Sequence, residues 1–100
     1  MKLEELPGGD LVGRGLSDLS AGRETEEALL VSIGATRLRR AGLAVPAAFP
    51  DASRRLYALL ASRFGDDAHA RYNALLRRLI SFERSLECAN PPRESGSAAS

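Results

Sequence analysis

The chain has one histidine and one cysteine, so His69 and Cys88 are the first places to look for site chemistry. A zinc-type site needs about four ligands, with His or Cys predominating. Both residues fall on one predicted helix, where the 19 positions between them span about 28 Å. This separation excludes a shared metal ion and a Cys–His nucleophilic pair within one chain. We expect no metal and no cofactor, and interpret Cys88 as a small residue near a helix end.

Arg63 and His69 enclose the string RFGDDAH, with the histidine six positions after the arginine. The spacing resembles the R-x(4–6)-H motif of HEPN-type ribonucleases, small helical proteins that dimerise around an RNA cleft. This resemblance implies that Arg63 contacts phosphate and that His69 serves the cleavage chemistry. The alternative, which we prefer, is that His69 is a surface or capping residue beside Asp66 and Asp67 at a helix start.

Arginines offer a different chemistry, the binding of phosphate groups. Residues 1–35 hold 3 basic and 7 acidic groups (net −4), residues 36–80 hold 9 and 3 (net +6), and residues 81–100 hold 2 and 3 (net −1), which gives the overall +1. The pattern predicts either a basic face or an acidic segment lying against a basic body. The candidate phosphate-binding residues are Arg37, Arg39, Arg40, Arg54, Arg55, Arg77 and Arg78.

The composition requires that helices position all of these residues. Leu and Ala occur 16 times each, whereas there are only 2 Ile, 3 Val and 2 Thr. Residues that lose little freedom in a helix therefore dominate, and the β-branched residues that favour sheets are nearly absent. At 100 residues with 44% hydrophobic content, we expect one all-α domain spanning residues 1–89.

Gly and Pro divide this domain into four helical stretches. We predict helices at 10–21 and 24–41, a third from the Asp51 cap to Gly65, and a fourth at 67–88. Gly13 and Gly15 inside the first helix suggest close packing of another backbone there. Residues 43–50 are predicted to be an apolar connector that packs Val45 and Phe49 onto the body, and residues 90–100 to be a flexible tail.

A helix-turn-helix motif with Gly34 as its turn is the alternative to a continuous helix over 24–41. Leu30 would then occupy the place of a small residue, and Arg40 would point inward. The continuous helix is therefore the preferred interpretation.

The fourth helix carries an a/d pattern of apolar residues that Leu76 and Ile80 widen into a broad stripe. We expect this helix to be the spine of an antiparallel four-helix bundle, with apolar surface left for a second copy and a homodimer interface on this helix or on the one at 24–41. The predicted oligomer interface consists of Tyr72, Leu75, Leu76, Leu79, Ile80, Phe82 and Leu86.

The cysteine count and the apolar segments of the chain indicate where the protein works and which kinds of partner it meets. A single cysteine excludes an internal disulfide framework, and neither a signal-type h-region nor an apolar run of about 18 residues is present. We therefore expect a cytoplasmic protein with no membrane contact. The leading functional hypothesis is a non-enzymatic homodimerisation module with an unknown protein partner. The alternatives are a nucleic-acid-associated protein that binds phosphates through residues 36–80 and, third, a HEPN-like ribonuclease.

Overall fold

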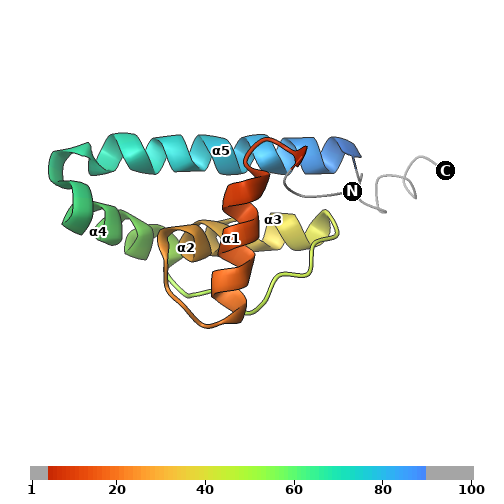
Figure 1. Ribbon diagram of the computed structural model, residues 1–100, viewed down its shortest axis with the longest axis horizontal. Coiled ribbons are helices and arrows are strands. Elements are labelled where there is room, and N and C mark those ends of the chain that lie inside the picture. The colour runs from red at the N-terminus through yellow and green to blue at the C-terminus, as the bar shows by residue number, and fades with distance from the viewer. Residues whose placement is uncertain (1–4, 90–100) are drawn as a thin grey trace.

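The computed structural model describes residues 5–89, and these residues contain helices and no strand (Figure 1). The predicted all-α class is therefore confirmed, whereas the predicted tail at 90–100 lies outside the described residues. The elements in chain order are α1 (Gly9–Ser20), α2 (Glu26–Ile33), α3 (Ala35–Arg40), α4 (Ala52–Phe64), the 3₁₀ helix η2 (Gly65–Asp67) and α5 (Ala68–Ala89).

The predicted continuous helix over 24–41 is corrected by a break at Gly34, which ends α2 and precedes α3. Gly34 has φ −93° and ψ 8°, outside helical values. The break is one residue long, shorter than the three to four residues of a helix-turn-helix turn, and α3 has only 6 residues. A Cβ there would lie 2.6 Å from Glu83 Oε2 and 3.2 Å from the Leu79 methyl groups of α5, so a larger residue would require these side chains to move.

The helices start close to the predicted positions, but the residues that cap them differ from the prediction. Thr25 caps α2, because its Oγ1 accepts the Ala28 N–H at 3.1 Å while its hydroxyl donates to Asp18 Oδ2 at 2.7 Å. Asp51 does precede α4, but it adopts a left-handed conformation with φ 53° and its side chain makes no capping bond. Asp10 lies inside α1, which begins after Gly8 at φ 78°.

The helices form two layers with α1 across one side (Figure 1). α4 and α5 run antiparallel through η2, and α2 and α3 continue the layer of α4 beneath α5. α1 crosses α2 and reaches α5. The largest fully buried side chains are Phe82, Leu29, Leu30, Leu38, Leu56, Leu60, Val12 and Val31.

The connector at 43–50 packs onto the body as predicted, because Val45 and Phe49 lie against the core. The buried Ser32 of α2 anchors it, since Ser32 Oγ accepts the Phe49 N–H at 3.1 Å and donates to the Ala28 carbonyl at 2.9 Å. Within residues 5–89, none of the helices has the length and apolarity needed to cross a membrane.

Candidate functional site

A groove of about 390 Å³ lies between the α2–α3 segment and α5. Its apolar floor comes from Ile33, Leu76 and Leu79, and Ile80, which is 41% exposed, lies at its edge. A second hollow of about 350 Å³ lies on the other side of Ile80. The groove is lined by Ile33, Gly34, Thr36, Arg37, Arg40, Leu76, Leu79, Ile80 and Glu83.

Arg37 and two glutamates of α5 form the polar end of this groove. Arg37 Nε and Nη2 donate to Glu87 Oε2 and Oε1 at 2.6 and 2.8 Å, a two-point contact, and Nη1 donates to Glu83 Oε1 at 3.2 Å. The bond from Arg37 lowers the pKa of Glu87. Burial raises the pKa of Glu83, although the nearby guanidinium opposes this. The two carboxyl groups thus share one cation but differ in how readily they ionise.

The other carboxylate oxygen of Glu83, Oε2, lies beside Gly34, where α2 and α3 meet. No hydrogen bond to Oε2 is found among the described residues, and this oxygen is not fully buried. It is an acceptor at the wall of an apolar groove, next to the Leu79 methyl groups that also approach Gly34. A partner that fills this groove therefore meets a carboxylate acceptor as well as aliphatic surface.

The N-terminal end of α1 contacts α5 on the flank that lies away from the groove. Arg78 Nη2 bonds Asp10 Oδ1 of α1 at 3.3 Å, and Gly8 approaches Arg78 and Phe82. Ile80 follows Arg78 by two residues, a rotation of about 200° around the helix. Ile80 therefore projects from the opposite flank, and no other described helix covers it there.

Most of the candidate phosphate-binding arginines are held by partners within the chain. Arg55 pairs with Glu24 at 3.0 Å, and Arg78 with Asp10. Arg39 donates to the carbonyls of Val45 and Pro46, and Arg37 is held as described above. Arg40 lies close enough to Glu87 to lower its pKa. Arg40, Arg54 and Arg77 make no side-chain hydrogen bond or ion pair among the described residues.

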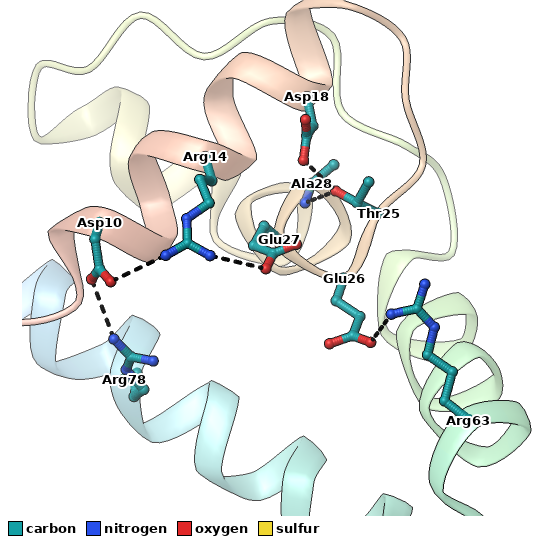
Figure 2. Close-up of polar contacts among 9 residues, drawn as sticks. All are labelled: Asp10, Arg14, Asp18, Thr25, Glu26, Glu27, Ala28, Arg63 and Arg78. Carbon is teal, nitrogen blue, oxygen red and sulfur yellow. Dashed lines mark hydrogen bonds and ion pairs between the residues drawn. The ribbon is translucent and has the colours of Figure 1, made fainter.

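These pairs explain the charge asymmetry along the sequence. Asp10 of α1 pairs with Arg78 of α5 at 3.3 Å, and Glu26 of α2 pairs with Arg63 of α4 at 2.8 Å. Figure 2 shows both pairs. Arg14 lies between Asp10 and Glu27 in the same view. Acidic groups of the first third therefore lie against the basic middle, which is the second of the two alternatives predicted from the charge pattern. Nucleic-acid binding by residues 36–80 stays a prediction.

Arg63 and His69 engage different partners. Arg63 Nη1 donates to Glu26 Oε2 at 2.8 Å, whereas the ring nitrogen His69 Nε2 lies 3.2 Å from Asn73 Nδ2. The His69 ring also lies edge-on to Tyr57, with centroids 6.5 Å apart. No contact joins Arg63 to His69 in the described part of the chain, and cleavage activity stays a prediction.

The predicted interface residues divide into two groups. Phe82 and Leu86 are buried in the core of the same chain, and Leu79, also buried, reaches the surface only at the floor of the groove. Tyr72, Leu75 and Leu76 are half-buried, and Ile80 is exposed. Sequence reasoning missed Ile33, Thr36 and Glu83 as groove residues. For Glu83 a signal was present in the sequence. Between residues 69 and 87, a second row of residues repeats at intervals of four and three, and each member follows a residue of the apolar row by one position.

The described residues hold no group of three or more His, Cys, Asp or Glu side chains that could bind a metal ion, and Cys88 is free and exposed. Comparisons with protein-family models, curated proteins and solved structures gave no match. The groove and its residues are therefore the basis for a functional assignment.

Proposed function

We propose that this protein is a non-enzymatic assembly module that forms a homodimer through the flank of α5 opposite α1. The observation that carries the proposal is the aliphatic surface of Leu76 and Ile80, which borders the groove on the flank that α1 leaves open. Exposed apolar surface next to a groove is typical of protein interaction sites. The pairing of most candidate arginines within the chain favours this function over nucleic-acid binding.

α5 is long enough to contribute to such an interface. It has 22 residues and is about 33 Å long, and a stable complex usually takes ~800 Å² from each partner. A two-fold dimer also needs only one surface patch, which both copies use.

The test is the solution mass of the wild type and of Ile80→Glu, measured by light scattering over a wide concentration range. We expect the wild type to have twice the chain mass of 10.7 kDa and Ile80→Glu to have the chain mass, because the added carboxylate would be desolvated at the interface. Ala74→Glu is the matched control, since Ala74 is also exposed on α5 but lies outside the groove lining. It should leave the dimer intact.

A wild-type protein that stays monomeric at every concentration contradicts the proposal. So does a dimer that Ile80→Glu and Ala74→Glu weaken equally, because its interface would then lie elsewhere. Circular dichroism of each variant checks that the helices are retained.

A further inference from the structure

α5 carries two parallel rows of residues at the four-three spacing of a helix interface. The first, the core seam, faces the interior with Ala68, Tyr72, Leu75, Leu79, Phe82 and Leu86. The second, the flank seam, lies one residue further along and consists of His69, Asn73, Leu76, Ile80, Glu83 and Glu87. Three of its members line the groove. A row with this spacing is the pattern by which one helix packs along another.

The chemistry of the flank seam reverses from one end to the other. Its first part carries the imidazole of His69 and the amide of Asn73, whose Nδ2 lies 3.2 Å from His69 Nε2. Its middle is Leu76 and Ile80, and its last part is acidic. Residues at equal distances before and after position 78 are therefore complementary. The imidazole of His69 matches the carboxylate of Glu87, the amide of Asn73 matches the carboxylate of Glu83, and Leu76 matches Ile80. A surface of this kind fits a second copy of itself in the reversed direction.

Resting on the proposed homodimer, we propose that the two copies of α5 pack antiparallel along their flank seams, centred near residue 78. Leu76 then contacts the partner's Ile80. The Asn73 amide donates to Oε2 of the partner's Glu83, an oxygen that is not fully buried and to which no hydrogen bond is found among the described residues. His69 faces the partner's Glu87, whose side chain is 30% exposed beside Arg37.

The parallel arrangement is disfavoured by the same residues. It would place Glu83 opposite the partner's Glu83 and Glu87 opposite the partner's Glu87, and like charges across an interface weaken binding. It would also align two long helix dipoles in the same direction, whereas the antiparallel arrangement brings opposite ends together. Charge and polarity therefore select the antiparallel direction.

The native Cys88 provides the first measurement, because it is the only cysteine in the chain and lies exposed outside both seams. In the proposed dimer the two Cys88 positions are separated by 20 residues of helix, or about 30 Å. In a parallel dimer they would lie at the same level, near the interaxial spacing of about 10 Å. We expect dipolar EPR of nitroxide-labelled full-length protein to give the longer distance, with the dimeric mass confirmed after labelling.

The second measurement is a double-mutant cycle on dimer dissociation with Asn73→Asp and Glu83→Gln. The two residues are about 15 Å apart along one helix, so strong coupling between them has to cross the interface. We expect Asn73→Asp to weaken the dimer roughly tenfold, and Glu83→Gln in the same chain to restore most of the loss.

The outcomes separate the two proposals. A dimer with a short Cys88 distance, or one in which Asn73 and Glu83 show no coupling, overturns the antiparallel arrangement but leaves the homodimer standing. A monomeric wild type overturns both.

Discussion

Glu83 and Glu87 bind one guanidinium, yet their surroundings shift their pKa values in opposite directions. The bond from Arg37 lowers the pKa of the half-buried Glu87, whereas burial raises that of Glu83. A lowered pKa in the folded state stabilises the fold above the ordinary value of 4.5, and this contribution is lost as the pH falls. A raised pKa has the opposite effect on stability. The folded state then binds the proton more tightly, so it loses stability as the pH rises above 4.5.

We therefore expect Glu83→Gln and Glu87→Gln to have opposite effects on stability at pH 7. Glu83→Gln should raise the urea midpoint because it removes a buried charge, and Glu87→Gln should lower it because it removes the acceptor of the Arg37 contact.

Urea unfolding followed by circular dichroism from pH 3 to 8 checks this prediction, and each variant is the control for the other. Both differences from the wild type should shrink below pH 4.5, as the carboxyl groups of the wild type become protonated. A Glu83→Gln variant that is less stable than the wild type at pH 7 would show that the Arg37 contact outweighs the burial of the charge.

None of these residue contacts was predictable from the sequence. Arg37 and Glu87 are 50 positions apart, and nothing in their local strings distinguishes them from other exposed charges. The carboxylate at position 83 lies on the same helix as the predicted apolar stripe, but only the packing of α5 against Gly34 shows that it is buried.

At the scale of the elements, α1 and α2 pack closely at a single glycine. A Cβ on Gly15 would overlap the Glu27 carbonyl oxygen and a Val31 methyl group, with the Glu27 carbonyl carbon 2.9 Å away, whereas a Cβ on Gly13 would meet nothing within 4 Å. The close packing of another backbone that the sequence suggested for both glycines is thus present at Gly15.

Substituting Gly13 and Gly15 separately by alanine compares the gain in helix propensity with the cost of close packing. We expect Gly15→Ala to reduce the free energy of unfolding by about 1–3 kcal/mol through overpacking. Gly13→Ala should raise it by up to about 1 kcal/mol, because alanine is the better helix former. Urea unfolding measures both, and a gain in stability for Gly15→Ala would mean that α1 can shift away from α2 at little cost.

The element boundaries were largely predictable, because caps, glycines and apolar periodicity are local signals. The predicted helices at 10–21 and 67–88 lie within one residue of α1 and α5. The break at Gly34 was not predicted. The local sequence there suits a helix, and the side chains that pack against Gly34, Glu83 and Leu79, come from a distant part of the chain.

At the scale of the whole molecule, dimerisation should couple to stability. A folded state that associates is stabilised by mass action, so the thermal midpoint of the wild type should rise with protein concentration, by about 3–5 °C for each tenfold increase. The midpoint of Ile80→Glu should not change with concentration. Thermal unfolding across a dilution series measures both, and a concentration-independent wild type would contradict the homodimer.

By itself, the sequence determined the helical class, most helix boundaries and the amphipathic character of α5, because composition and periodicity act through neighbouring residues. Only the tertiary structure decided which of two adjacent seams on α5 enters the core, since a rotation of about 100° separates them. It also decided that acidic residues of the first third pair with three arginines of the basic middle. Both outcomes depend on contacts between residues far apart in the chain.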